Sequence, residues 1–313
     1  MSSGSLAVSG EHPAALEPGG PIGPGPGLDY IARAGVAWRK LIGDRALAIP
    51  LGVLALIVLA AIFGPIIWGK NPDAQQLLVA LESPSASHPM GTDQLGRDIF
   101  ARVLDGARIS LVVASIVTLA GAVVGSLIGL LAGTLGGALD SIPMRVMDAI
   151  LAFPPLILAM AVTVGLGVGL DSAAIGIALV SVPWYARLIR SEALRIRSLP
   201  FIESANAIGS TRARIIAKHV VPHLLPVLLI QMAAAFGYAV LALAGLSFVG
   251  LGAQIPTPEW GAMITDGLSY SLTGQWWVAV FPGVALLTTV TAASMLSDRM
   301  RDVLDPRGEV ARI

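Results

Sequence analysis

Six long apolar runs constrain what this chain can fold into more than any other feature of its sequence. A helix needs about 20 apolar residues to cross the hydrocarbon core of a bilayer. Hydrophobic residues make up 55% of the 313 residues and charged residues only 13%. The sequence therefore predicts an all-α, polytopic integral membrane protein with six transmembrane helices. The expected spans are 46–68, 109–132, 147–166, 172–185 (extending toward 188), 224–246 and 276–296.

The positions of Lys and Arg predict how the spans are oriented. Of the 20 Lys and Arg residues, only four lie in the segments that we place outside, namely Lys70, Arg97, Arg102 and Arg108. The other sixteen lie on the opposite side. Because positive charge is enriched in cytoplasmic segments, we expect both termini and the loop at 201–222 in the cytoplasm.

The composition also limits the chemistry of the chain. It has no cysteine, which excludes disulfides and thiolate metal sites, and its formal net charge of zero argues against nucleic acid as a partner. No lysine follows the glycine-rich pattern of a phosphate-binding loop, so another subunit would have to hydrolyse any ATP. His219 and His223 stand four apart, but Pro222 separates them and no third ligand is near. We therefore expect no metal or cofactor on this chain.

No ionisable residue lies well inside any span, since Asp148 and Arg187 stand at span edges. A charge at the bilayer centre costs about 2.5–3.5 kcal/mol on insertion scales, so it is retained where ion coupling needs it. An ion-coupled secondary carrier, the less favoured alternative, would need such an acid and an inverted repeat. An intramembrane enzyme would need catalytic groups at depth. A wide, weakly selective path for polar solutes fits better.

Glycines recur every four residues in and after the second span. This spacing lets another helix backbone approach closely. We expect helix packing, with lining of a translocation path as the alternative. The glycines are Gly121, Gly125, Gly129, Gly133 and Gly137.

The polar loop FIESANAIGSTRARIIAKHVVP at 201–222 divides at Gly209. Residues 203–208 predict one short helix and residues 211–219 a second, with Gly209 allowing a sharp angle between them. Glu203 is expected to pair with Arg212 or Arg214 across the bend. Taken alone, the loop fits an ordinary basic cytoplasmic loop equally well.

An outer segment reads HPMGTDQLGRD over residues 88–98. Asp93 is a suitable N-cap residue. Behind it, apolar residues from Leu95 to Ala107 form one stripe, with Arg97, Asp98, Arg102 and Asp105 opposite. This pattern predicts an amphipathic helix lying at the outer membrane interface.

The loop resembles the EAA loop of ABC importer permeases. The resemblance rests on Glu203-Ser204-Ala205, Gly209 and Val221-Pro222, with Ser204 and Val221 departing from the usual Ala and Leu. It implies a coupling helix seated in a groove of an ATPase subunit. The residues that would contribute to coupling are Glu203, Ser204, Ala205, Gly209, Arg212 and Arg214.

The outer segment is similar to the GTDxxGRD signature of peptide/nickel-type ABC importer permeases, specifically their second permease subunit. The signature residues are Gly91, Thr92, Asp93, Gly96, Arg97 and Asp98. The stretches GLSFVGLG at 245–252, PEWG at 258–261 and LDPR at 304–307 also resemble that family. Together these stretches extend the resemblance over most of the chain after residue 38.

This resemblance implies a type I ABC importer permease fold in a bacterial cell membrane. Residues 1–38 would be a disordered cytoplasmic tail, 39–68 a peripheral transmembrane helix, 69–108 an extracytoplasmic segment, 109–297 the permease core and 298–313 a cytoplasmic tail. The implied partners are a homologous permease subunit, two ATPase subunits (or one fused chain) carrying ATP-Mg, and an extracytoplasmic substrate-binding protein. Di- or oligopeptides are the implied substrate; nickel chelates, glutathione or haem stay open.

Overall fold

A computed structural model of the protein describes residues 45–304, so the expected tail at 1–38 and most of the one at 298–313 lie outside the described residues. Within 45–304 the chain is helical, and its β structure is limited to one isolated bridge between Thr92 and Asp98. The α-helices are α2 (Arg45–Trp68), α3 (Ile99–Leu135), α4 (Ala138–Leu151), α5 (Pro155–Leu166), α6 (Leu170–Arg197), α7 (Pro200–Ala207), α8 (Arg212–Ile215), α9 (Val221–Phe248), α10 (Trp260–Ser271) and α11 (Trp277–Leu304).

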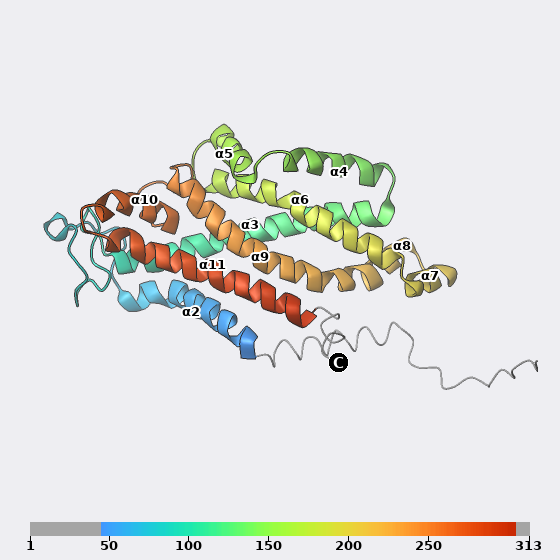
Figure 1. The fold of residues 1–313 in the computed structure, drawn as a ribbon, viewed down its shortest axis with the longest axis horizontal. Coiled ribbons are helices and arrows are strands. Elements are labelled where there is room, and N and C mark those ends of the chain that lie inside the picture. Colours follow the sequence, from blue (N-terminus) through green and yellow to red (C-terminus); the bar gives the residue numbers. More distant parts are fainter. Residues whose placement is uncertain (1–44, 305–313) are drawn as a thin grey trace, which may run out of the picture.

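Five helical stretches are long and apolar enough to cross a membrane. They comprise α2, α3, α6, α11 and the continuous stretch from α8 through α9. Figure 1 shows them running along the long axis of the molecule, with α9 beside α11 and α6. The prediction of an all-α membrane protein is confirmed, with α4 and α5 together standing where the third span was expected.

That third span is not one straight helix, and this part of the prediction is wrong. α4 and α5 meet at an angle of 94°. Pro154 and Pro155 follow each other at the break, and proline lacks a backbone N–H and disfavours a helical conformation in the residue before it. Apolarity alone could not indicate the break, because all of the residues around it are apolar.

The second and fourth spans are longer than expected. α3 runs for 37 residues from Ile99, so the amphipathic stretch near residue 100 is the first part of a spanning helix and not a separate interfacial element. Its N-cap is Asp98, whose side chain accepts a hydrogen bond from the Ala101 N–H, and not Asp93. α6 continues to Arg197 because its charged last turns can stay helical beyond the membrane.

α3 packs against α6 through a stripe of glycines. A Cβ atom added at Gly125 would lie 2.5 Å from the Val182 carbonyl oxygen, and one at Gly129 would lie 2.3 Å from the Ala186 carbonyl oxygen. The two backbones therefore approach as closely as glycine allows. Gly137 lies beyond the end of α3 with a φ of +63° and does not extend the stripe. The stripe consists of Gly121, Gly125, Gly129 and Gly133.

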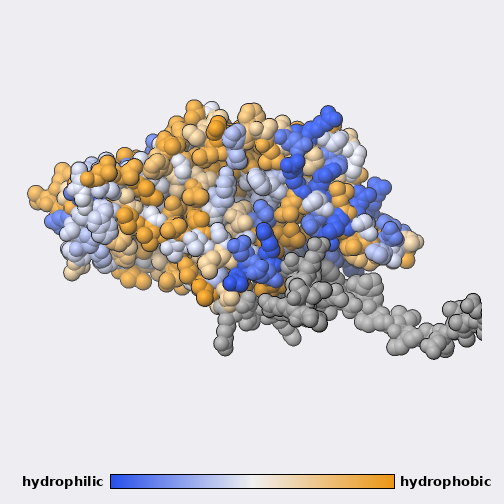
Figure 2. All heavy atoms as spheres, viewed as in Figure 1, coloured by the Kyte–Doolittle hydropathy of each residue, from blue (hydrophilic) through white to orange (hydrophobic). Residues whose placement is uncertain are grey.

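The surface is apolar over most of its length. Figure 2 shows hydrophobic residues over much of the view, while hydrophilic residues gather toward the end that holds α4, α7 and α8. Large aliphatic side chains on α2 and α3, such as Ile66 and Ile116, are more than half exposed. Such a surface suits a protein whose solvent is lipid.

Candidate functional site

The segment between α6 and α9 forms two short helices at one end of the bundle (Figure 1). α7 begins with Pro200, which suits the first turn because N–H groups there have no partner within the helix. Gly209 then takes a left-handed conformation with a φ of +79°. α8 follows Thr211, whose hydroxyl accepts a hydrogen bond from the Arg214 N–H at 3.4 Å. The expected helices on either side of Gly209 are confirmed.

α7 has one face buried in its own chain and one face exposed. Ile202 and Ala205 are buried, whereas Glu203 and Ser204 are exposed and Ile208, just beyond the helix, is 83% exposed. The buried face belongs to a group of apolar residues that we call the α7 cluster. Its buried members are Ile189, Ala193, Ile196, Ile202, Ala205, Ile215, Val220 and Leu224.

One expectation about this loop is corrected. Among residues 45–304, Glu203 forms no ion pair with Arg212 or Arg214. All three side chains are exposed, where an ion pair adds at most about 1 kcal/mol. Ala205 faces the α7 cluster, so its side chain packs toward the spanning helices.

Aromatic rings connect α7 to the start of α9. The Phe201 ring stacks on His223 with 5.4 Å between centroids, and the His219 ring lies 6.0 Å from it. His219 belongs to a π-helical turn, Ile216–Val220, which joins α8 to α9. In the described part of the chain, no group of three or more His, Asp or Glu side chains is arranged to hold a metal ion.

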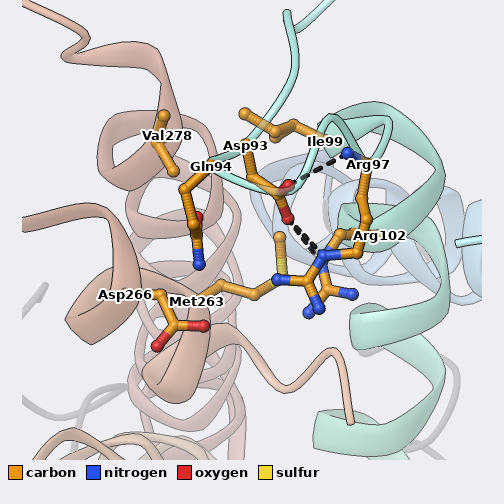
Figure 3. Close-up of a pocket in the computed structure, with 8 residues that line it drawn as sticks. All are labelled: Asp93, Gln94, Arg97, Ile99, Arg102, Met263, Asp266 and Val278. Atoms are coloured by element: carbon orange, nitrogen blue, oxygen red, sulfur yellow. Dashed lines mark hydrogen bonds and ion pairs between the residues drawn. The ribbon is translucent and has the colours of Figure 1, made fainter. Parts of the chain in front are cut away.

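The opposite end of the bundle gathers the residues of the outer segment around Asp93 (Figure 3). One carboxylate oxygen of Asp93 accepts hydrogen bonds from the N–H groups of Leu95 and Arg97, both at 2.9 Å. The other lies 2.6 Å from Arg97 Nε and 3.6 Å from Arg102 Nε. Asp93, Arg97 and Arg102 are all buried. The expected position of Arg97 and Arg102 on the polar face of an interfacial helix is therefore wrong, because their charges face Asp93 and not solvent.

Asp98 forms a second buried centre. Its carboxylate accepts from the Ala101 N–H and lies 2.9 Å from both Lys70 Nζ and His88 Nδ1. Burial alone would raise the pKa of Asp98, but the hydrogen bonds from Ala101, Lys70 and His88 together hold this pKa below its ordinary value. Asp98 thus fixes the chain at residues 70 and 88 to the start of α3.

The glycines of the outer segment allow close backbone contacts. Gly96 has a φ of +70°, and a Cβ atom there would lie 1.9 Å from the Gln76 carbonyl oxygen. Gly91 has a φ of +74°, and its Cβ would lie 2.6 Å from the Glu82 carbonyl oxygen. Between them, the Thr92 hydroxyl accepts a hydrogen bond from the Glu82 N–H at 2.8 Å. These contacts fold residues 76–96 back on themselves.

The sequence did not indicate how α10 would join this outer end. Glu259 is fully buried, caps α10 and accepts a hydrogen bond from the Ser110 hydroxyl at 3.3 Å. The Trp260 indole N–H donates to the Val103 carbonyl oxygen at 3.1 Å. Glu259 and Trp260 lie in the stretch PEWG. That stretch alone does not indicate that their hydrogen-bond partners lie about 150 residues away in the sequence.

Asp266 on α10 faces the Arg97 and Arg102 side chains across a cavity of about 10 Å³, roughly the room one water molecule needs (Figure 3). Burial raises the pKa of Asp266, against the opposing effect of the two arginines. Among residues 45–304, no group forms a hydrogen bond with the buried Nη1 atom of Arg97. These groups hold one another in place, and they include no nucleophile next to a general base.

A set of helices long enough to span a membrane, with an ion-paired cap at one end and a two-helix loop at the other, defines a helical multi-pass membrane protein. Residues 125–309 match the family described as binding-protein-dependent transport system inner membrane component. Residues 34–84 match the N-terminal transmembrane domain of oligopeptide transport permease C. The chain belongs to this family of ABC importer permeases and is a multi-pass inner-membrane protein.

Curated relatives cover most of the chain. The probable D,D-dipeptide transport system permease protein DdpC of Escherichia coli (strain K12) is 42% identical, over 82% of this chain and 85% of its own. The dipeptide transport system permease protein DppC of Alkalihalophilus pseudofirmus is 37% identical, over 87% and 89%. The glutathione transport system permease protein GsiD of Salmonella typhimurium is 40% identical, over 86% and 89%.

A solved structure supports the fold. A chain from inward-facing conformations of the MetNI methionine ABC transporter matches with a TM-score of 0.52 and 21% identity, over 66% of this chain and 98% of its own. At this identity the match bears on fold alone. The expected type I ABC importer permease fold is confirmed.

Proposed function

We propose that this chain couples ATP hydrolysis on partner subunits to the passage of di- or oligopeptides through the membrane. The observation that carries the proposal is the two-faced α7. Its inner face is held to α6 and α9 by the α7 cluster, while its outer face presents Glu203, Ser204 and Ile208 to whatever binds there. An exposed Ile208 at the tip of such a helix suits a partner groove with an apolar wall.

Movement of α7 would be passed on through packing. Side chains in a closely packed cluster shift together, because small displacements within it cost van der Waals contacts. A partner that moves α7 therefore also displaces the inner ends of α6 and α9. The chain would perform no chemistry itself. It would act as a two-state element whose equilibrium is shifted by ATP-driven closure of the partner.

The partners we propose follow from this role and from the family. Two ATPase subunits, or one fused chain, would carry ATP-Mg and bind α7. A homologous permease subunit would complete the path, and an extracytoplasmic binding protein would deliver substrate at the end that carries residues 69–98. This arrangement places both termini in the cytoplasm, in agreement with the distribution of Lys and Arg.

Peptides are the substrate class that best unites the similar proteins. DdpC and DppC are named for dipeptides, and GsiD for glutathione, which is itself a short peptide. We therefore place glutathione-like peptides within the proposed substrate class, and nickel chelates or haem outside it. Uptake of labelled di-, tri- and pentapeptides by cells lacking the gene, with and without complementation, tests this assignment.

The coupling role is tested with two variants of the exposed face. Glu203→Ala and Ile208→Ala should each lower peptide uptake by the reconstituted complex and weaken retention of the ATPase subunits during purification. Ser191→Ala is the matched control, because Ser191 is an exposed residue on α6 and does not belong to α7. It should leave both measurements unchanged. If uptake and subunit retention stay normal in both α7 variants, this face does not bind the ATPase.

A further inference from the structure

An open groove lies on α3 near the end of the bundle that carries residues 69–98. It encloses about 340 Å³ between α3 and the first residue of α6. Four of its six lining residues are aliphatic, and the other two carry opposite charges. The lining residues are Asp105, Arg108, Ile109, Val112, Val113 and Leu170.

The two charged residues of this groove lie on one side of α3. Asp105 and Arg108 are three residues apart on α3, so they lie on the same side of the helix. Over residues 45–304, neither side chain has an ion-pair partner. Arg97 and Arg102, which come earlier in the sequence, differ in this respect because both are buried in ion pairs.

An exposed apolar stripe continues from the groove along α3. No charged residue follows Arg108 until after the end of α3. Val112, Ile116 and Leu119 are 51%, 58% and 56% exposed, and their spacing of three or four residues places them on the same face as Asp105 and Arg108. From residue 109 to 119 the helix rises about 15 Å, half the thickness of a bilayer hydrocarbon core.

We propose that this groove and stripe bind one phospholipid with a primary ammonium head group, from the leaflet on the side of residues 69–98. Arg108 contacts the phosphate, Asp105 contacts the ammonium, and an acyl chain lies along Val112, Ile116 and Leu119. Guanidinium groups bind phosphate through paired hydrogen bonds, and a primary ammonium can donate to a carboxylate.

The order of the charges along α3 supports this ligand. Arg108 borders the apolar stretch, and Asp105 lies about 4.5 Å farther from it along the helix axis. In a phospholipid the phosphate is next to the glycerol and the ammonium lies beyond it, farther from the acyl chains. The groove is therefore complementary to the lipid: its apolar stripe, positive Arg108 and negative Asp105 match the acyl chain, the negative phosphate and the positive ammonium in the same order. A peptide also carries two opposite charges, but it would leave the exposed stripe uncovered.

The absence of cysteine from the sequence allows a local test. A single cysteine introduced by Ile116→Cys is labelled with an environment-sensitive fluorophore in the purified complex. The complex is reconstituted into phosphatidylcholine vesicles that contain rising fractions of phosphatidylethanolamine with brominated acyl chains, which quench nearby fluorophores. Leu59→Cys on α2, where the native side chain is 51% exposed, provides a matched reporter on another helix.

We expect the reporter at position 116 to show about a threefold preference for phosphatidylethanolamine over phosphatidylcholine, the size that one exposed charge contact provides. The reporter at position 59 should show no preference. Asp105→Asn should remove the preference at 116, because only phosphatidylethanolamine carries the primary ammonium. Arg108→Gln should keep the preference but weaken lipid binding at 116 in general, because the phosphate that it contacts is common to both lipids. Both variants should leave quenching at 59 unchanged, which shows that the variants are folded and embedded.

Three outcomes would overturn the proposal. An equal lipid preference at both reporters would mean that the groove adds nothing to ordinary lipid contact. A reporter at position 116 that no brominated lipid can quench would mean that another protein chain covers the stripe. Loss of quenching on addition of a dipeptide would mean that the charged pair binds the transported molecule.

Discussion

The guanidinium Nε atom of Arg97 lies 2.6 Å from the Oδ2 atom of Asp93, and both side chains are almost completely buried. The same carboxylate closes the turn before α3 by accepting two backbone hydrogen bonds. One ion pair thus determines both the shape of the turn and the position of Arg97, from which α3 starts two residues later.

Arg97→Gln should therefore be strongly destabilising. Removing one partner of a buried pair typically costs about 3–5 kcal/mol, because the other charge stays buried, and Arg102 at 3.6 Å offsets this only in part. Thermal unfolding of the purified complex measures the loss. Arg187→Gln is the control, since its pair with Asp148 is exposed and should change stability by at most about 1 kcal/mol. Equal losses in the two variants would contradict the role of burial.

Two acids at the same end should respond oppositely to replacement by their amides. The pKa of Asp98 is lowered, so its ionised form stabilises the fold above the ordinary carboxyl pKa, and this stability is lost as pH falls through the lowered pKa. Asp98→Asn should cost about 1–3 kcal/mol at neutral pH.

The pKa of Asp266 is raised instead, so its protonated form stabilises the fold, and this stability is lost as pH rises through the raised pKa. Asp266→Asn should therefore leave neutral-pH stability unchanged or slightly higher. Unfolding midpoints of both variants and of the unchanged protein from about pH 2 to pH 8 measure the two trends, because the Asp98 contribution is lost only below the ordinary carboxyl pKa. A loss of stability in Asp266→Asn equal to that in Asp98→Asn would refute the assignment.

The contact between α3 and α6 should not tolerate a methyl group. Gly129→Ala forces a Cβ atom to within 2.3 Å of the Ala186 carbonyl oxygen, so the helices must separate, at a cost of about 1–3 kcal/mol. Gly245→Ala on α9 is the matched change. Within residues 45–304, no atom beyond the neighbouring backbone of α9 lies within 4 Å of its Cβ position, so the change should be neutral or stabilising. Thermal unfolding of the two variants decides between a specific contact and a general effect of glycine.

The bend between α7 and α8 should depend on the backbone conformation of Gly209. Its φ is +79° and no atom lies within 4 Å of its Cβ position, so a side chain would meet strain without a clash. That strain is about 1–2 kcal/mol for most residues and less for asparagine. Gly209→Val should lower uptake per ATP hydrolysed, whereas Gly209→Asn should retain most of it. Similar ratios in both variants would show that the conformation of residue 209 does not affect coupling.

Much of the fold could be predicted from the lengths of the apolar runs. Five of the six expected spans correspond to continuous helices, because a run of about 20 apolar residues has few other stable arrangements in a membrane. The break at Pro154 could not be predicted from apolarity, and the true length of α6 was obscured by its charged last turns. The length of a helix beyond the membrane depends on its local sequence, and hydropathy does not measure this dependence.

The candidate sites were predicted less completely. Gly209 identified the bend in the coupling loop, since a glycine between two helical patterns has a clear conformational meaning. The burial of Arg97 and Arg102 could not be predicted, because a periodic pattern assigns charges to solvent unless their partners are known. The partners of Arg102 include Asp73 and the Pro256 carbonyl oxygen, which are about 30 and 150 residues away in the sequence.

The near-perpendicular junction of α4 and α5 has a consequence for where water can reach. Neither half is long enough to cross a bilayer, and the chain between them is not helical, so the carbonyl groups there need partners other than those that a continuous helix supplies. Hydrocarbon cannot satisfy those groups; only a hydrated channel or an adjoining polypeptide can. The break between α4 and α5 therefore needs water or protein against it, and not lipid alone.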